Sequence, residues 1–251
     1  MAFNPTLSVI TIVYNNVRDI ERTMLSVLNQ TYPNIEYIIV DGKSTDGTLQ
    51  IIERYKSRIA NLISEKDEGI YDAMNKGIAA ATGDYVIFMN SGDEFYKSDT
   101  VEKVFETAPD ADIYYGETEM INDAGESLGQ RRHKAPAQFT WRDFKFGMSI
   151  SHQAIYIRRS LTEPYNRKYQ LSADIDWIIR AAKKAKTIVN ANRYVAKYLV
   201  GGMSKAKHRQ SLQERYNIMK EYYGLVPTVL NHFVIAVNLA WYWLRHKRTN
   251  D

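Results

Sequence analysis

The 251-residue sequence contains no cysteine, which excludes disulfide bonds and thiolate metal sites. A chain without disulfides suits a reducing cytosol. The first residues show neither a basic segment nor a small-residue cleavage site, so no signal peptide is expected. Internal repeats and low-complexity linkers are also absent. With 45% hydrophobic and 25% charged residues, the chain has the composition of a globular protein that buries a core.

Two common nucleotide-binding loops are missing as well. No G-x-G-x-x-G segment occurs between a predicted strand and a helix, which argues against a dinucleotide site. No G-x-x-x-x-G-K-[ST] segment occurs either, which excludes a P-loop. If the chain binds a nucleotide, it must hold it in another way.

Acidic residues are scarce toward the C-terminus. Residues 1–176 carry 19 Lys and Arg against 26 Asp and Glu, whereas residues 177–251 carry 14 against 3, a net charge of +11. Such a basic region favours an anionic partner, which could be nucleic acid, phosphate groups or an acidic membrane surface. A solvated basic face without a function is the alternative.

Short apolar runs alternate with helical patterns in the first half of the chain. The predicted strands are 7–13, 35–40, 59–64 and 85–89, and the predicted helices are 17–29, 49–55 and 70–81. Strands that alternate with helices are typical of an α/β fold with a parallel sheet. In the second half the patterns predict strands at 113–115, 154–157 and 187–200 and a helix at 172–185, and then two helical pieces within 210–248, broken near Gly224 and Pro227.

Polar residues follow three of the predicted strands directly. These segments are Thr11–Asn15, Asp41-Gly42 and Asn90–Asp93. Ligands of open α/β sheets bind at the carboxyl ends of the strands. There an aspartate can accept a hydrogen bond from a base, a tyrosine can stack on it, and a further carboxylate can hold a divalent cation. The pattern therefore favours a nucleotide-diphosphate site, although an ordinary turn would also explain each of these residue types.

Four motifs, in this order, carry a resemblance to a known family: VITIVYN, IEYIIVDGKSTDGT, EKDEGIYDAMNKGI and NSGD. They resemble the family 2 glycosyltransferases of GT-A fold, and in particular bacterial enzymes of surface-polysaccharide assembly, including the colanic-acid type. SHQAIYI, SADIDW and GGMS extend the likeness, so that it spans roughly residues 6 to 205. The resemblance implies a Rossmann-like, mostly parallel sheet flanked by helices, with a C-terminal helical extension.

The resemblance also implies roles for individual residues of the first half. The expected nucleotide-binding residues are Thr11, Tyr14, Asp41, Asp67, Asn75 and Lys76. NSGD stands where the family has its Asp-x-Asp motif, but Ser91 leaves Asp93 as the only aspartate. We expect Asp93, together with diphosphate oxygens and water, to hold Mn²⁺ or Mg²⁺.

Asp174 matches the general base of these enzymes, which would take the proton of the acceptor hydroxyl in a single inverting displacement. Asp176 is the alternative, and at a spacing of i, i+2 on a helix the two side chains face different ways. His152 is expected to contact the diphosphate or the acceptor, with a packed core histidine as the alternative. Other candidates for the diphosphate lie in or after a predicted lid at 201–205, where a solvated loop is the alternative: Lys205, His208 and Arg209.

The resemblance divides the chain into three regions: a nucleotide-sugar-binding half (1–108), an acceptor-binding and catalytic half (109–209), and C-terminal helices (210–251). The expected donor is UDP- or GDP-linked, and the acceptor is a glycan or a lipid-linked glycan. No nucleic acid is expected as a partner, and the oligomeric state is left open between a monomer and a homodimer. A non-catalytic nucleotide-sugar- or glycan-binding module and a nucleotidyltransferase are the alternative functions.

The last helical segment has an amphipathic pattern. Residues 225–244 are twenty in number, which could just span a bilayer. Asn231, Asn238, Tyr242 and Arg245 share one helical face, and the wide remaining face is apolar. This pattern favours a helix in the membrane interface, and thus a cytoplasmic enzyme peripheral on the inner face of the cell membrane. Packing on the protein itself, contact with a second subunit and a true span are the alternatives.

Overall fold

The computed structural model describes residues 3–131, 134–147, 150–201 and 207–247. In these ranges nine strands form one sheet in the order β3-β2-β1-β4-β8-β6-β9-β5, with β7 paired to β6. The strands are β1 (Leu7–Val13), β2 (Ile35–Asp41), β3 (Asn61–Ser64), β4 (Tyr85–Phe88), β5 (Glu94–Phe95), β6 (Ile113–Ile121), β7 (Ser127–Gln130), β8 (Ile155–Arg158) and β9 (Ile188–Leu199).

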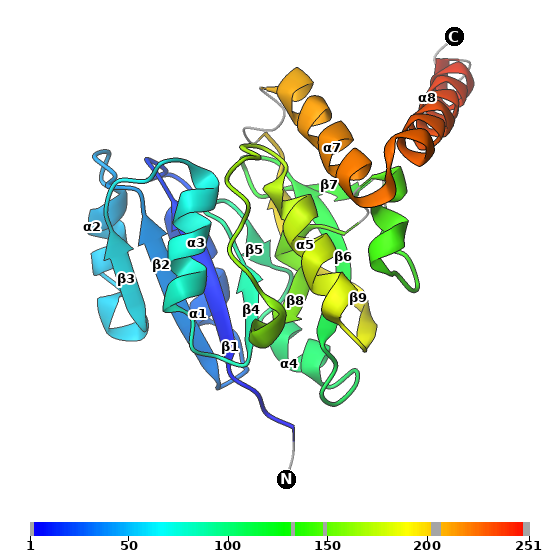
Figure 1. Cartoon of the computed structure of the whole chain (residues 1–251). Coiled ribbons are helices and arrows are strands. Elements are labelled where there is room, and N and C mark those ends of the chain that lie inside the picture. The colour runs from blue at the N-terminus through cyan, green and yellow to red at the C-terminus, as the bar shows by residue number, and fades with distance from the viewer. Residues whose placement is uncertain (1–2, 132–133, 148–149, 202–206, 248–251) are drawn as a thin grey trace.

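Helices cover both faces of the sheet (Figure 1). The α-helices are α1 (Ile20–Leu28), α2 (Thr48–Glu53), α3 (Ile70–Ala80), α4 (Thr100–Phe105), α5 (Ala173–Lys184), α7 (His208–Tyr223) and α8 (Leu225–Lys247), and the short 3₁₀ helices are η1 (Lys56–Arg58), η2 (Trp141–Phe146), η3 (His152–Ala154) and η4 (Arg159–Leu161). The layered α/β architecture expected from the alternating pattern is therefore confirmed.

The N-terminal half of the sheet is parallel. Strand β1 pairs in parallel with β2 and β4, and β2 pairs in parallel with β3. All of Leu7–Val13 is buried, because helices pack on both faces of this strand. Alternate residues of β1 enter different cores: Ile10 and Ile12 pack with α3 and α5, whereas Val9 and Val13 pack with α1 and α4.

The second half of the sheet is mixed. Strand β8 is antiparallel to both β4 and β6, β6 is parallel to β9, and β9 is antiparallel to β5. Strand β6 runs on to Ile121, well beyond the predicted 113–115, because its pairing with β9 continues to the Ile121–Leu199 pair. This continued pairing brings the end of β9 beside the ends of the parallel strands.

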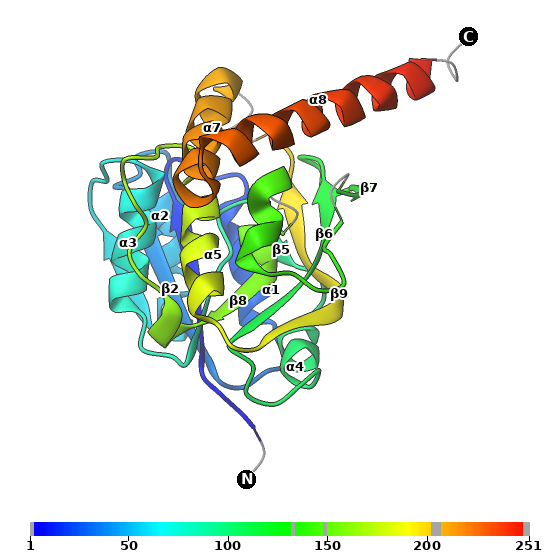
Figure 2. The same ribbon diagram turned by 45° about the vertical axis from the view of Figure 1, so that its right-hand side comes forward.

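Helices α7 and α8 meet at Gly224, whose φ of 84° few other residues adopt. Pro227 lies in the first turn of α8, where proline interrupts no helical hydrogen bond. The predicted break is therefore at Gly224 and not at Pro227. Helix α8 extends away from the body (Figure 2). Within the described ranges, no helix combines the length and the apolar character that crossing a bilayer requires.

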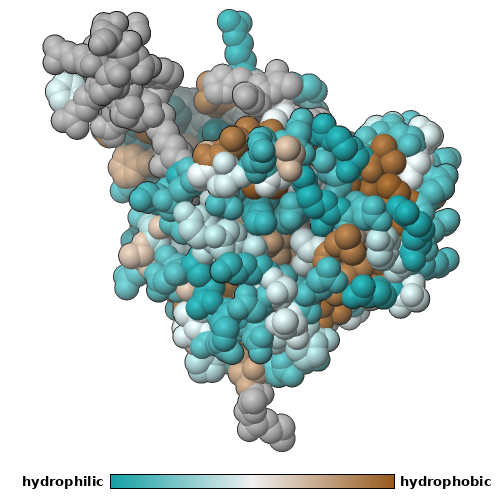
Figure 3. Space-filling model, turned by 180° about the vertical axis from the view of Figure 1, so that it is seen from behind, coloured by the Kyte–Doolittle hydropathy of each residue, from teal (hydrophilic) through white to brown (hydrophobic). Residues whose placement is uncertain are grey.

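The carboxyl ends of the parallel strands lie at the end of the molecule away from the N-terminus (Figure 1). Helices α7 and α8 lie at this same end. Viewed from behind, the surface of the body is mostly hydrophilic, with scattered hydrophobic patches (Figure 3). The fold thus directs the polar strand ends and the C-terminal helices toward one side.

Candidate active site

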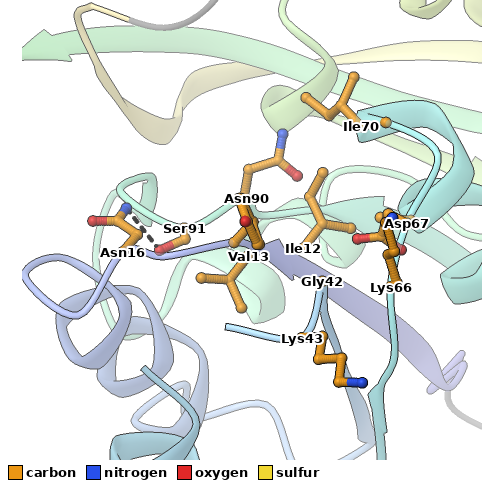
Figure 4. A pocket seen from close by; sticks show the side chains of 13 residues that line it. Ile12, Val13, Asn16, Gly42, Lys43, Lys66, Asp67, Ile70, Asn90 and Ser91 are labelled. Carbon is orange, nitrogen blue, oxygen red and sulfur yellow. Dashed lines mark hydrogen bonds between the residues drawn. The ribbon is translucent and has the colours of Figure 1, made fainter. Parts of the chain in front are cut away.

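A pocket of ≈ 710 Å³ opens at the carboxyl ends of β1, β2 and β4, beside the first turn of α3 (Figure 4). Its lining residues are Ile12, Val13, Tyr14, Asn16, Gly42, Lys43, Lys66, Asp67, Gly69, Ile70, Ala73, Asn90 and Ser91. We call it the strand-end pocket. It has the position that open α/β sheets give to their ligands.

Gly42 lies between Tyr14 and Asp67 in the wall of this pocket. A Cβ added to Gly42 would lie 2.6 Å from Asp67 Oδ2 and 3.2 Å from Tyr14 Cδ2. Tyr14 is 66% exposed, so its ring is available for stacking. Burial raises the pKa of Asp67, although Lys76, 3.0 Å away, opposes this rise. An aromatic face and a carboxylate acceptor therefore border the same space, as a nucleobase requires.

Four of the predicted nucleotide-binding residues lie behind the pocket and do not line it. Thr11 is buried and donates to the carbonyl of Met89 (2.7 Å). Asp41 is buried and accepts from Ser64 Oγ (2.7 Å) and from the backbone N–H of Ser44.

Asn75 is bound to the backbone of Tyr165, and Lys76 Nζ forms ion pairs with Glu65, Asp67 and Asp72. The polar groups of Thr11, Asp41, Asn75 and Lys76 bind other parts of the protein, and their direct contact with a nucleotide stays a prediction. Among the predicted six, Tyr14 and Asp67 line the pocket.

A second pocket of ≈ 570 Å³ adjoins the first and shares Asn16, Ile70, Asn90 and Ser91 with it. We call it the reaction pocket. It is also lined by Asp93 in the turn after β4, by η3, by the segment before α5 and by the end of β9. Its other lining residues are Asp93, His152, Gln153, Gln170, Leu171, Tyr198, Leu199, Val200 and Gly201, with Arg18, Asp19, Tyr71 and Asp123. One elongated ligand could occupy both spaces.

The NSGD turn forms the boundary between the two pockets. The backbone N–H of Asp93 donates to the carbonyl of Asn90 (2.9 Å), which closes the turn. Gly92 has a φ of 105°, and a Cβ there would lie 2.8 Å from Leu199 Cδ2, so only glycine fits. Ser91 Oγ accepts from Asn16 Nδ2 at 3.0 Å (Figure 4). The turn is thereby fixed to both β9 and the loop after β1.

Asp93 is buried under the reaction pocket. Its Oδ2 accepts from Gln153 Nε2 (2.7 Å) and its Oδ1 from the backbone N–H of Leu199 (3.1 Å). Burial raises the pKa of Asp93 to about 6, although the bond from Gln153 opposes the rise. A positive charge nearby would stabilise the carboxylate that burial destabilises.

The oxygen atoms of Asp93 and Asn90 in this turn are possible ligands of a divalent cation. Among the described residues, no three His, Asp or Glu side chains come together as a metal cage. A single carboxylate is nevertheless sufficient when phosphate oxygens and water complete the shell. Asp93 retains a free lone pair on each oxygen, and the buried Asn90 Oδ1 in the same turn has no hydrogen-bond partner. The residues fit a cation that arrives with a diphosphate.

Asp174 lies in the first turn of α5 and is 18% exposed. His152 Nδ1 lies 3.5 Å from Asp174 Oδ2, and the hydroxyl of Tyr71 donates to Oδ1 at 3.4 Å. Burial acts to raise the pKa of Asp174, but hydrogen bonding and charge from His152 outweigh it and leave the pKa lowered. Asp174 is therefore an ionised carboxylate at neutral pH.

Asp176 faces the other way, as the helical spacing predicts. It is buried, pairs with Arg180 (2.9 Å) and accepts from the hydroxyl of Tyr222 (2.7 Å). Both of its oxygens are thus engaged in joining α5 to α7. This arrangement disfavours Asp176 as the alternative base, because it is buried and both of its oxygens already have partners.

The remaining predicted residues are placed only in part. Lys205 and the side chain of His208 lie outside the described residues. Arg209 is exposed at the start of α7 and lines neither of the two pockets. The sequence interpretation did not name Asn16, Tyr71 or Asn90 as site residues, although Asn90 belongs to the NSGD motif and Tyr71 to EKDEGIYDAMNKGI.

Solved structures of other proteins identify the fold. TarS of S. aureus (residues 1–349) superposes with a TM-score of 0.67 at 20% identity, over 91% of this chain and 72% of TarS. The mannosyltransferase PcManGT of Pyrobaculum calidifontis, in complex with GDP-Man and Mn²⁺, gives a TM-score of 0.59 at 18% identity, over 95% and 75% of the chains. The fold is the GT-A glycosyltransferase fold, as expected.

Sequence comparison identifies the family. The model of glycosyl transferase family 2 matches residues 8–163. An uncharacterised glycosyltransferase of Mycobacterium tuberculosis is 34% identical over 192 residues, which are 72% of this chain and 71% of the relative. TuaG of Bacillus subtilis, named for teichuronic acid biosynthesis, is 32% identical over 202 residues, 78% and 79% of the two chains. The protein belongs to glycosyl transferase family 2, and the resemblance seen in its motifs is confirmed.

Gly42→Ala tests the strand-end pocket. The φ of Gly42 lies outside the left-handed region, so alanine fits the backbone, but its methyl group must displace Asp67 or Tyr14. We expect binding of a nucleoside diphosphate, measured by calorimetric titration, to weaken about 10-fold, as for other overpacked sites. The melting temperature should stay within a few degrees of wild type. An unchanged affinity would show that the base does not occupy this wall.

Proposed function

We propose that the protein is an inverting glycosyltransferase that moves a sugar from a UDP- or GDP-linked donor to a hydroxyl group of a glycan. One observation carries the proposal: His152, which lines the reaction pocket beside a strand-end pocket suited to a nucleotide, lies 3.5 Å from the ionised carboxylate of Asp174. The two spaces match the two parts of a nucleotide-sugar. Polysaccharide biosynthesis is supported by the name of TuaG.

Related folds support the class of donor. TarS has been solved with UDP and with UDP-GlcNAc, and PcManGT with GDP-Man. In this chain, Tyr14 offers a ring to either base and Asp67 offers an acceptor to an N–H of either base. The same contacts serve uracil and guanine, so the proposal includes both donors.

The chemistry proposed for Asp174 is a single displacement. The acceptor oxygen forms a bond to the anomeric carbon while the bond from that carbon to the diphosphate oxygen breaks. The carboxylate of Asp174 takes the proton of the acceptor hydroxyl, and the nucleoside diphosphate leaves with the bonding electron pair. Attack from the opposite side inverts the anomeric configuration, which NMR of the product's anomeric proton measures.

A metal ion is part of the proposal. Asp93 would hold Mn²⁺ or Mg²⁺ together with oxygens of the donor diphosphate and water. When bound, the cation supplies positive charge to the departing diphosphate. The Mn²⁺ in the PcManGT complex supports this assignment.

A thermal-shift panel tests donor and metal together. Wild-type protein is heated with UDP, GDP, dTDP or CMP, each with Mn²⁺ or with EDTA. UDP or GDP should raise the melting temperature by mass action, and the rise should be larger with Mn²⁺. Asp93→Asn should lose the effect of Mn²⁺ while it retains part of the effect of the nucleotide. Equal shifts with Mn²⁺ and EDTA would contradict the metal assignment.

Asp174→Asn tests the general base. Asparagine retains the shape of aspartate but cannot take the proton, so the release of nucleoside diphosphate from the donor should fall about 10²-fold or more. Nucleotide affinity should barely change, because Asp174 lies outside the strand-end pocket. Asp176→Asn is the matched comparison: it should lower the melting temperature but leave turnover per folded molecule within a few fold. The reverse pattern would assign the base to Asp176.

A membrane surface and a lipid-linked acceptor complete the proposal. Eight apolar residues of α8 are 44–70% exposed: Leu225, Val226, Val229, Leu230, Phe233, Val234, Val237 and Trp241. At 100° per residue they fall on one half of the helix circumference. The sequence of α8 contains no Asp or Glu, and it ends in Arg245, His246 and Lys247. An apolar face with a basic end suits a helix in an anionic membrane interface.

The position of α8 supports the same acceptor. Helix α8 lies at the end of the molecule to which the strand ends point (Figure 1). An enzyme bound to the inner face of the cell membrane through α8 would therefore hold its reaction pocket toward that surface. An acceptor carried on a lipid would reach the site without leaving the membrane. Pairing of two chains through α8 is the competing arrangement.

Negative charge introduced on the apolar face of α8 tests membrane binding. Phe233→Asp with Val237→Asp should abolish flotation of the full chain on vesicles that contain phosphatidylglycerol, because two carboxylates oppose both insertion and attraction. Gln213→Asp with Asn217→Asp adds the same charge on exposed positions of α7 and should retain flotation. Failure of the wild type to float, with a dimer that only the α8 variant dissociates, would assign the face to a second copy.

A further inference from the structure

His152 links the strand-end turn to the helix that carries the base. Asn90 Nδ2 lies 3.0 Å from His152 Nε2, and His152 Nδ1 lies 3.5 Å from Asp174 Oδ2. Asn90 follows β4, His152 lies in η3, and Asp174 lies in the first turn of α5. Three side chains from three separate elements therefore form one continuous chain beside the reaction pocket.

The direction of each hydrogen bond follows from chemistry. Asp174 is ionised, and an ionised carboxylate can only accept. His152 therefore presents an Nδ1–H to Asp174, and in the neutral tautomer its unprotonated Nε2 accepts the amide N–H of Asn90. The hydroxyl of Tyr71 donates to the other oxygen of Asp174. Each carboxylate oxygen is thus held from one side by a fixed donor.

The exposure of the pair argues for a role in the reaction. The side chains of His152 and Asp174 are 16% and 18% exposed, so neither is sealed in the core. His152 lines the reaction pocket, and Asn90 lines both pockets. A histidine that only packed in the core would not line the pocket. His152 lines it and also connects Asn90, in the wall shared by both pockets, to Asp174.

Several other charged groups surround the pair. Arg131 and Arg215 interact electrostatically with Asp174. Burial raises the pKa values of Tyr198 and Tyr165, and the charge of Asp174 raises them further. No ion pair joins Arg131 or Arg215 to Asp174 among the described residues. Within the described part of the chain, the hydroxyl of Tyr71 donates to one oxygen of Asp174 at 3.4 Å, and Nδ1 of His152 faces the other oxygen at 3.5 Å.

We propose that His152 is a positioning residue that holds the Asp174 carboxylate toward the acceptor oxygen. The inference rests on the proposed function, since it takes Asp174 as the general base. The Nδ1–H bond fixes the rotation of the carboxylate, and the Asn90 bond fixes the imidazole. Because Asn90 also borders the strand-end pocket, the base is placed relative to the same turn that contacts the donor. This role differs from the expected contact of His152 with the diphosphate or the acceptor.

His152→Asn and His152→Gln distinguish the roles of the two ring nitrogens of His152. The amide nitrogen of asparagine falls near the place of Nδ1 and can still donate to Asp174. The amide of glutamine reaches the place of Nε2, near Asn90, and leaves Asp174 without its donor. His152→Ala removes both contacts. The full chain is used, and the readout is nucleoside diphosphate release from the donor selected in the thermal-shift panel, with water as the acceptor.

We expect His152→Ala and His152→Gln to lower kcat by roughly 10- to 100-fold, the range for a misplaced catalytic group. His152→Asn should retain kcat within a few fold of wild type. The KM for the donor and the affinity for the nucleoside diphosphate should change less than about 3-fold in all three, since a positioning residue acts after binding. Melting curves confirm that each variant is folded.

Three results would overturn the inference. An equal loss of kcat in His152→Asn and His152→Gln would contradict the role of Nδ1. An unchanged kcat in His152→Ala would contradict any role of His152 in the reaction. A raised KM with an unchanged kcat would assign His152 to the donor diphosphate instead. Absence of donor turnover in the wild-type chain, by contrast, would contradict the proposed function itself.

Discussion

The carboxylate of Asp93 holds the site together. It accepts from Gln153 in η3 and from the backbone of Leu199 at the end of β9, while its own backbone closes the turn after β4. These segments are far apart in sequence, and each supplies lining of the reaction pocket. The cost of burying the carboxylate appears in its pKa of about 6. Burial of the Asp93 carboxylate is unfavourable, and the positive charge of a cation bound there would offset this cost.

Two carboxylates of the site have opposite electrostatic environments. Burial dominates at Asp93 and raises its pKa, whereas the hydrogen bond and charge from His152 prevail at Asp174 and lower its pKa. Enzymes commonly separate the roles of paired acids through such differences in environment. Here Asp174 is ionised and 18% exposed, whereas Asp93 is buried but still lines the reaction pocket. Hydrogen-bond partners, more than position along the chain, distinguish the two roles.

The sequence predicted the layers, the order of most elements and the strand ends that form the site, because these depend on local periodicity. It also predicted that Asp174 and Asp176 face different ways, since helical geometry fixes this. Thr11, Asp41 and Asn75, which were expected to contact the nucleotide, are not in the pocket lining, and that contact stays a prediction. Their side chains bind partners at Met89, Ser64 and Tyr165, and only the folded chain brings those partners near. A strand buried on both faces gives no sequence signal for which residue reaches the pocket.

Hydrogen bonds join α7 to α5 and to the segment before it. Asp176, two residues after Asp174, accepts from Tyr222 of α7, and Glu214 of α7 accepts from the backbone of Gln170 and Leu171, which line the reaction pocket. Glu214 is buried, so these bonds are shielded from water and act at full strength. Helix α8 follows α7 after the single residue Gly224 and packs against it. Helix α8 is therefore connected through α7 to the segment 170–171, which lines the reaction pocket and directly precedes α5.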